Sequence, residues 1–215
     1  MSDFNILLNA GVETAVASTK AYTAKLSVLL LLVFSMTSKL SEGKQILEKT
    51  ADEAGRLLDK KNVDMIKKLA VKLKGSKGIY AIGRGVSFSS ALETALKIKE
   101  VSYISSEGLA GGELKHGPIA LIENGTPCVV FAPNDETYDS IISNAMEVKS
   151  RGGFTIGVSH KNSNAFEYWI KVEDLKDGSF IAQIVPIQLL AYFLALERKL
   201  DPDKPRNLAK SVTVK

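Results

Sequence analysis

An alternation of short apolar runs with longer helical patterns between residues 78 and 200 sets the narrowest limit on the fold. The apolar runs cover 78–82, 127–132, 154–158 and 166–172. The helical patterns cover 87–101, 138–150 and 180–200, and a shorter one starts at Ser106 or Glu107 and runs toward Lys115. Strands that alternate with helices form parallel βαβ units covered on both faces. We therefore predict an α/β fold with a doubly wound parallel sheet and a ligand crevice beyond its carboxyl strand ends.

The N-terminal part lies outside this alternation. Residues 4–8 form an apolar run typical of one strand, and because a lone strand is unstable it must join a sheet built elsewhere. Helical patterns follow over 13–40, 44–58 and 63–74. We expect Gly43 and its neighbours to end the first helix, and Asn62 to cap the third. These three helices are expected to bridge to a neighbouring domain or subunit.

Composition excludes several classes of protein. The 215 residues are 45% hydrophobic and 24% charged, which suits one soluble globular domain, or one domain and a piece of another. The single cysteine, Cys128, excludes an internal disulfide, and two histidines leave little material for a zinc site. The net charge of +4 is spread among acidic groups, so no nucleic-acid stripe is predicted. The apolar run 28–34 is far shorter than the ~20 residues that span a bilayer.

A glycine-rich loop, GRGVSFSS (83–90), lies between a predicted strand and a predicted helix. Glycines allow close backbone approach and a helix N-terminus favours anions, so Arg84, Ser87 and Ser89 form a candidate anion loop. The loop is neither a Walker motif nor GxGxxG, because Phe88 stands at the third glycine position. A tight turn with a serine cap explains the same residues equally well.

Three charged residues, Glu93, Lys97 and Glu100, share one face of the following helix at spacings of four and three. One reading is an exposed ladder of weak ion pairs. The other is a carboxylate base beside a lysine, which proton transfer next to a carbonyl requires. Whether the face is buried decides between the two readings, because burial and neighbouring charge both move a carboxyl pKa.

Three further residues could carry chemistry. His116 precedes Gly117 and Pro118, so it lies on a loop, where it could act as acid or base or complement a helix dipole. Lys210 lies in the tail and could form a Schiff base with a sugar carbonyl, although composition favours a frayed tail. We expect His160 to lie at the surface.

Four strings together resemble the isomerase half of the glucosamine-6-phosphate synthase family, also called glutamine–fructose-6-phosphate aminotransferase (isomerising). They are VASTKAY (16–22), ALKIKE (95–100), GELKHGP (112–118) and PRNLAKSVTV (205–214). The tail string separates this family from other sugar-isomerase (SIS) domain proteins. The resemblance implies a five-stranded, flavodoxin-like three-layer αβα sheet in a second SIS domain over 43–200. Residues 1–42 are then the last strand and long helix of a first SIS domain, and 201–215 a catalytic tail.

The resemblance also implies roles for individual residues. Glu100 is expected to move the proton between C1 and C2, with Lys97 beside it, and Lys210 to form the Schiff base with fructose 6-phosphate. His116 is expected to assist ring opening in the neighbouring subunit's site. Further residues expected to line the sugar are Val16, Ser18 and Ala209. In this family the second domain's loop is not the main phosphate site, which speaks against the candidate anion loop. The family commonly ends in Glu, where Lys215 stands here.

The implied function is to bind fructose 6-phosphate and carry the ketose-to-aldose isomerisation that yields glucosamine 6-phosphate in amino-sugar biosynthesis, on the pathway to UDP-GlcNAc. The chain is expected to be a cytoplasmic homodimer that needs no metal or organic cofactor and binds neither nucleic acid nor membrane. The family's glutaminase domain is outside this chain, so we expect a fragment that cannot use glutamine. The alternatives are a free-standing SIS phosphosugar isomerase or deaminase, and a non-enzymatic sugar-phosphate-binding module.

Overall fold

A parallel sheet forms the centre of the computed structural model, which describes residues 3–211. Its strand order is β2-β1-β3-β4-β5, with every neighbouring pair parallel. The strands are β1 (Gly78–Gly83), β2 (Ser105–Ala110), β3 (Pro127–Ala132), β4 (Phe154–Ser159) and β5 (Tyr168–Lys171). The predicted five-stranded, doubly wound α/β fold is confirmed, and the strand order reverses between β1 and β3, where such sheets bind ligands.

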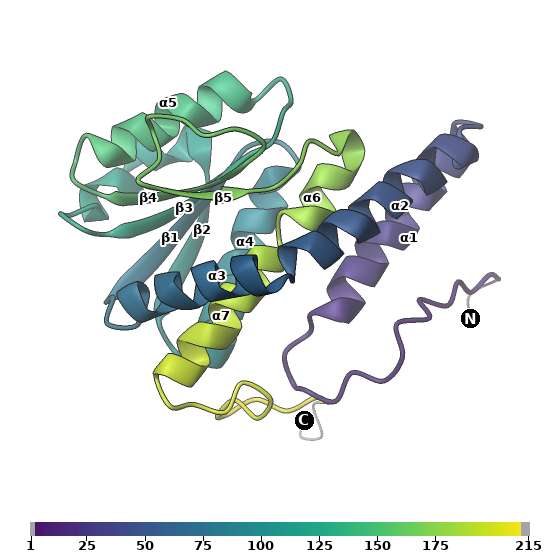
Figure 1. The fold of residues 1–215 in the computed structure, drawn as a ribbon, viewed down its shortest axis with the longest axis horizontal. Helices are drawn as coiled ribbons and strands as arrows, with labels where there is room; N and C mark the ends of the chain where they lie inside the picture. The colour runs from purple at the N-terminus through teal and green to yellow at the C-terminus, as the bar shows by residue number, and fades with distance from the viewer. Residues whose placement is uncertain (1–2, 212–215) are drawn as a thin grey trace.

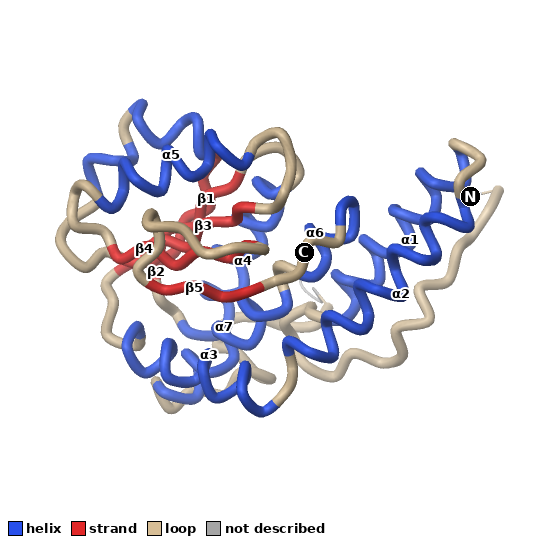
Figure 2. The backbone as a smooth tube through the Cα atoms, turned by 45° about the horizontal axis from the view of Figure 1, so that its top comes forward, coloured by secondary structure: helices blue, strands red, loops and turns tan. Residues whose placement is uncertain are grey.

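Helices cover both faces of this sheet, as Figures 1 and 2 show. The helices of the described part are α1 (Lys20–Met36), α2 (Leu40–Leu57), α3 (Lys60–Leu73), α4 (Ser87–Ser102), α5 (Tyr138–Lys149), α6 (Ser179–Ala182) and α7 (Val185–Glu197). Helix α5 lies on one face, and α3, α4 and α7 lie on the other. Helices α1 and α2 pack side by side and extend away from the sheet (Figure 1).

The sheet is buried on both faces because side chains alternate along each strand. On β3, Val129 and Phe131 join the core beneath α3, α4 and α7. Their neighbours Cys128, Val130 and Ala132 join the core beneath α5. All six residues of β3 are buried, which explains why its sequence is continuously apolar.

Two glycines let α4 lie unusually close to β1 and β2. A Cβ atom on Gly83 would lie 2.1 Å from the carbonyl oxygen of Ser87, and one on Gly108 would lie 2.5 Å from that of Ala91. Both contacts are with helix backbone, which cannot move aside without moving α4. The position of α4, and with it the face that carries Lys97, therefore depends on these glycines.

We expect Gly108→Ala to lower the free energy of unfolding by about 3 kcal/mol, because the methyl group forces α4 away from the sheet. The matched control is Gly55→Ala on the exposed side of α2, where a Cβ meets nothing within 4 Å. That change should stabilise the chain by about 0.5–1 kcal/mol, through better helix propensity. Urea unfolding of the two variants measures both values, and equal stabilities would contradict the expected close packing.

Three expectations about the N-terminal helices are wrong in detail. Helix α1 begins at Lys20 and not at residue 13, and α2 already includes Gly43. The break falls instead at Ser38, whose φ is 60°. Gly43 lies inside α2 and not at a helix end. A glycine suits this position because a Cβ there would lie 2.7 Å from Cβ of Phe34, so its absence lets α1 and α2 meet. Asp59, and not Asn62, caps α3, since the Asn62 N–H donates to Asp59 Oδ1 over 2.8 Å.

The strand expectations need two corrections. The helix expected from residue 106 toward 115 is strand β2 followed by a 3₁₀ turn over Gly111–His116. Ser105–Ala110 pairs in register with β1, and Ser106 Oγ donates to the Ile79 carbonyl over 2.7 Å, so pairing outweighs a weak local pattern. Residues 4–8 form no strand and are largely exposed.

The last helical pattern, 180–200, is also divided, into α6 and α7, with Pro186 near the start of α7, and a 3₁₀ turn (Lys176–Gly178) precedes it. An 18-residue window within Lys176–Glu197 has a mean hydropathy of 1.8, so by length and composition this stretch could cross a membrane. In the fold 61% of that window is buried, and α7 packs against α3 and α4. Its apolar character is therefore explained by its place in the core.

Candidate active site

The charged face of α4 is buried, so the reading as an exposed ladder is wrong. The Lys97 side chain is only 5% exposed, and its Nζ lies 3.7 Å from Glu93 Oε1 and in close contact with Glu100 Oε2. Burial raises the pKa of Glu93, Lys97 lowers it, and Glu100 raises it again, for a net increase. The cluster thus holds two carboxylates and one ammonium in a nearly dry setting, where charges interact strongly.

The cover over this face comes from the segment before α1 and from α7. A cavity of about 150 Å³ lies beside Lys97, bounded on the other sides by Ala17, Thr19, Gln188 and Tyr192 among others. Gln188 Nε2 donates to the Thr19 carbonyl over 3.3 Å and so joins α7 to the covering segment. Residues far apart in the sequence therefore enclose the cluster.

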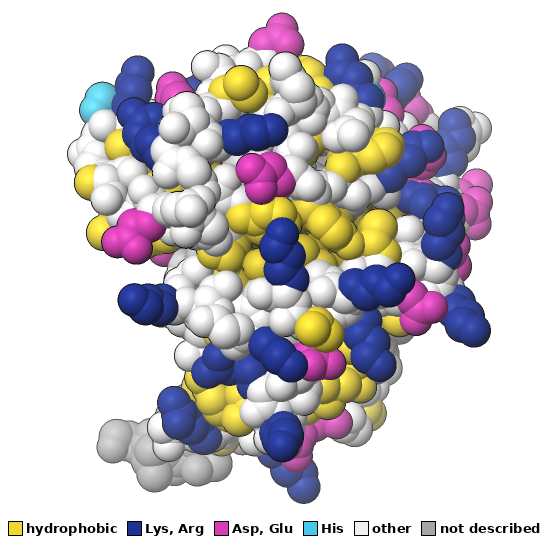
Figure 3. All heavy atoms as spheres, turned by 60° about the vertical axis from the view of Figure 1, so that its left-hand side comes forward, with side chains coloured by type: hydrophobic (Ala, Val, Ile, Leu, Met, Phe, Trp, Pro, Cys, Tyr) yellow, Lys and Arg dark blue, Asp and Glu magenta, His cyan; other side chains and the backbone are white. Residues whose placement is uncertain are grey.

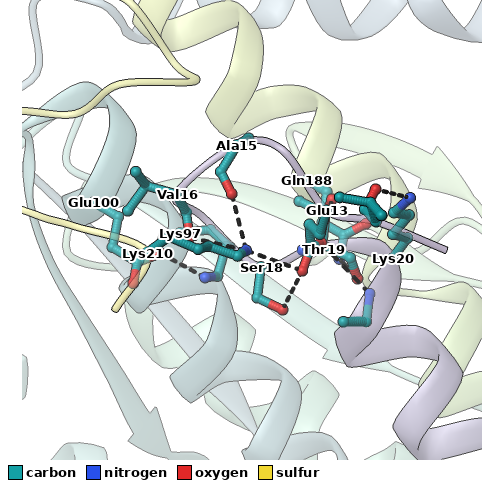
Figure 4. Close-up of polar contacts among 12 residues, drawn as sticks. Glu13, Ala15, Val16, Ser18, Thr19, Lys20, Lys97, Glu100, Gln188 and Lys210 are labelled. Carbon is teal, nitrogen blue, oxygen red and sulfur yellow. Dashed lines mark hydrogen bonds and ion pairs between the residues drawn. The ribbon is translucent and has the colours of Figure 1, made fainter. Parts of the chain in front are cut away.

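Lys210 contacts the segment before α1 that covers this face, although it is 197 residues from Glu13, with which it forms an ion pair. Its Nζ donates to Glu13 Oε2 over 3.3 Å, to the Ala15 carbonyl over 2.9 Å and to the Val16 carbonyl over 3.5 Å. Figure 4 shows Lys210 at these groups, and Ala15 also lines the cavity beside Lys97. The fold therefore gathers Lys97, Glu100, Lys210 and two of the expected sugar-lining residues, Val16 and Ser18, in one place. Ala209 precedes Lys210 and is exposed.

The described part of the tail is held in place, contrary to the frayed tail that composition favours. The Arg206 N–H donates to the Tyr103 hydroxyl over 2.6 Å, and its guanidinium lies 4.3 Å from the centre of that ring. The Val16 N–H donates to the Asp203 carbonyl over 3.1 Å. Tyr103 ends α4 in the left-handed region, with φ 58°, and so joins the tail to the helix that carries Glu100. The tail residues 212–215, including Lys215, lie outside the described residues.

Glu13 is a site residue that sequence reasoning missed. Burial alone would raise its pKa, but the N–H groups of Thr19 and Ala21, the Lys210 ammonium and the Ser18 hydroxyl together lower it to about 2. Its carboxylate therefore stays ionised at any physiological pH. The sequence carries no signal for this role, because Glu13 lies seven residues before α1, outside the spacing of any capping motif.

The two histidines lie away from this cluster. His116 is exposed at the end of the Gly111–His116 turn, and none of the contacts above includes it. Its expected role in a neighbouring subunit stays a prediction. His160 is half-buried rather than at the surface, with its ring 5.3 Å from that of Tyr138. Burial, followed by the charge of Lys161, lowers the pKa of His160.

The candidate anion loop is engaged in contacts within the protein. Arg84 Nε donates to Asn144 Oδ1 over 2.9 Å, and Gln183 Nε2 donates to the buried Ser87 Oγ over 3.0 Å. Ser89 Oγ donates to the Val86 carbonyl over 2.6 Å. These side chains hold the turn together, which favours the reading as a structural turn.

The crevice expected at the switch point is present, but the catalytic candidates do not line it. It is a cavity of about 1020 Å³ between α1 and the loops after β1 and β3, with Asp135 and Glu136 on its wall. Helix α4 begins near the carboxyl end of β1 and runs back along the sheet. Its later turns, with Lys97 and Glu100, therefore lie toward the amino ends of the strands. The chain order of strand and helix therefore separates the two cavities.

The surface shows neither a basic stripe on the face drawn nor, within the described residues, a group of metal ligands. On the face shown in Figure 3, Lys and Arg side chains are scattered among acidic and apolar groups and form no continuous stripe. Within residues 3–211, no three His, Cys, Asp or Glu side chains are grouped in a way that could hold a metal ion.

Comparison with known proteins shows what the chain is similar to. A family model described as the SIS domain matches residues 72–167. The glutamine–fructose-6-phosphate aminotransferase (isomerizing) of Thermococcus kodakarensis is 43% identical over 100% of this chain and 37% of its own length. The enzyme of the same name from Bacillus licheniformis is 43% identical over 99% of the chain and 36% of its own length. The chain thus spans little more than a third of these curated relatives.

Solved structures show the same correspondence. The C-terminal domain of glucosamine-fructose-6-phosphate aminotransferase from Francisella tularensis matches with a TM-score of 0.78 and 31% identity, covering 90% of this chain and 58% of that one. A glucosamine-6-phosphate deaminase from Thermotoga maritima shares the fold, with a TM-score of 0.69 and 24% identity over 94% of this chain and 59% of that one. Residues 72–167 therefore match the SIS-domain family, and nearly the whole chain is similar to part of the glutamine–fructose-6-phosphate aminotransferases, including the C-terminal domain of one of them.

Proposed function

We propose that this chain binds fructose 6-phosphate and carries the ketose-to-aldose conversion that yields glucosamine 6-phosphate in amino-sugar biosynthesis. The observation that carries the proposal is that Lys210 contacts the Ala15–Val16 segment, and that Ala15 lines the same cavity as Lys97, which pairs with Glu100. A primary amine and a carboxylate are the two groups that this conversion needs. The names of the relatives support the sugar substrate.

The chemistry follows from these groups. The Lys210 amine attacks the C2 carbonyl carbon of the open-chain sugar, and the carbonyl oxygen leaves as water, so that a C=N bond forms. This imine makes the C1 hydrogen more acidic. Ammonia then adds to the imine carbon and displaces the Lys210 amine, so that the lysine is freed and the C=N bond carries the transferred nitrogen. Glu100 removes the C1 proton as a base and a proton is returned at C2, which leaves an aldehyde at C1 and an amino group at C2. His116 assists ring opening from a neighbouring subunit.

The proposal extends to the assembly. Residues 1–42 complete a preceding SIS domain, residues 43–200 form the second and residues 201–215 the tail, within a cytoplasmic homodimer. Nitrogen comes from glutamine, which the names of the relatives include, through a glutaminase domain of a longer protein. The apolar side chains that α1 exposes, Leu29, Val33 and Met36, support a cover from outside this chain.

The test is a chimera in which this chain replaces the matching C-terminal part of the Thermococcus kodakarensis enzyme. We expect the chimera to form glucosamine 6-phosphate from fructose 6-phosphate and glutamine, measured by colorimetric detection of the amino sugar. A folded chimera that binds fructose 6-phosphate in calorimetry without turnover would favour the sugar-phosphate-binding module instead. A chimera that turns over another ketose phosphate but not fructose 6-phosphate would favour a different SIS isomerase.

A further inference from the structure

We propose that Glu13 is a positioning residue that fixes the amine of Lys210 at the sugar site. The part of this inference that concerns sugar chemistry rests on the proposed function. The part that concerns the position of Lys210 rests on geometry alone. Neither residue is close to the other in sequence, and they meet only because the tail returns to the segment before α1.

The ammonium of Lys210 has three donors, and the structure provides three acceptors for them. Two are the carbonyls of Ala15 and Val16, and the third is Glu13 Oε2, which alone among the three carries a charge. An acceptor for each donor gives the Nζ atom a defined place, although the Lys210 side chain is 45% exposed. A free lysine of that exposure would sample many rotamers, and ordering it has an entropic cost that these contacts offset.

Glu13 is suited to this role because it is itself held firmly. Its side chain is only 12% exposed. Oε1 accepts the Thr19 N–H over 2.7 Å and Oε2 accepts the Ser18 hydroxyl over 3.1 Å, so the carboxylate is bound to the two residues just before α1. The fixed partner of the pair is therefore Glu13, and Lys210 is the partner that it places.

Glu13 cannot serve as the base for Lys210. Hydrogen bonds and the Lys210 charge lower its pKa to about 2, despite burial that acts in the opposite sense, so it rarely accepts a proton near neutral pH. A positioning role needs a permanent anion, which this environment maintains. Proton transfer is left to other groups of the site.

The tail has a second, independent attachment that allows the role of Glu13 to be isolated. Arg206 is bound to Tyr103 by a hydrogen bond and by ring contact, four residues before Lys210. Loss of the Glu13 contact should therefore free the Lys210 side chain without releasing the tail at Arg206. Glu13→Gln is the informative variant because the amide oxygen can still accept the Thr19 N–H while the charge is lost.

The first experiment labels the 215-residue chain briefly with an acetylating reagent at neutral pH and quantifies each lysine by peptide mass spectrometry. We expect Glu13→Gln to raise the labelling rate of Lys210 about two- to five-fold, the range typical of a lost exposed ion pair. Lys60, on another part of the surface, is the internal reference. The matched control is Glu48→Gln on the exposed side of α2, which removes the same charge and should leave Lys210 unchanged.

Two readouts separate positioning from a loosened tail. Trypsin cleavage after Arg206 should be unchanged in Glu13→Gln and faster in Tyr103→Phe, which loses the hydroxyl contact. In the chimera, Glu13→Gln should lower kcat several-fold with little change in KM for fructose 6-phosphate, and Glu13→Asp, with a shorter reach, should not restore it.

Unchanged labelling of Lys210 in Glu13→Gln would overturn the positioning role, whatever the chimera does. Faster cleavage after Arg206 in Glu13→Gln would also overturn it, because Glu13 would then hold the whole tail and not the amine alone. If labelling changes as expected but no variant of the chimera acts on fructose 6-phosphate, the positioning of Lys210 stands and the proposed function fails.

Discussion

Replacing Glu100 by Gln is expected to lower the chimera's rate of glucosamine 6-phosphate formation about 10²- to 10⁴-fold, the usual contribution of a general base. Glutamine has nearly the shape of glutamate and its amide oxygen can still accept from Lys97, so the buried cluster keeps its packing. What is lost is the ability to take a proton from C1. Fructose 6-phosphate should bind with nearly unchanged affinity.

Turnover is measured by the amino-sugar assay, and binding by calorimetry on the same samples. A second, direct readout is the exchange of the C1 hydrogen of fructose 6-phosphate with deuterated water, which should stop in Glu100→Gln. Glu48→Gln serves again as the control for a lost surface charge. A rate within about threefold of the unaltered chimera would remove Glu100 from the proposed mechanism.

Replacing Lys210 by Ala or Arg is expected to abolish imine formation and to lower turnover by at least about 10²-fold, because the covalent route is lost. Arginine keeps a positive charge that can still face Glu13, so it tests the amine and not the ion pair. Borohydride in the presence of fructose 6-phosphate delivers hydride to the imine carbon and leaves a stable secondary amine. Mass spectrometry should find this adduct on Lys210 and in neither variant.

The matched control for Lys210 is Lys204→Ala, which removes an exposed lysine from the same tail. It should leave both the adduct and the rate unchanged. An adduct on Lys97 or Lys204 in the unaltered chimera, or full turnover without Lys210, would assign the imine to another lysine or exclude it altogether.

Much of the fold was predictable because strong local patterns carry it. The continuous apolar run of β3 and the helical face of α4 both appear at nearly the expected bounds. Strand β2 was not predictable, because Ser105–Ala110 is polar and half-exposed and becomes a strand only through pairing with β1. The strand predicted over residues 4–8 was wrong in the opposite sense: the pattern is apolar but the residues form no strand. An apolar pattern alone does not make a strand, because a strand also depends on pairing.

The candidate site shows the same division. The sequence by itself determined which reactive groups are available. These are two carboxylates and a lysine on one helix face, and a lysine in the tail string PRNLAKSVTV. It could not tell whether Lys97 is exposed, because the residues that bury it come from α7 and the segment before α1. Only the tertiary structure decided that Glu13 meets Lys210. Contacts between residues so distant in sequence depend on the packing of the whole chain, which no local pattern encodes.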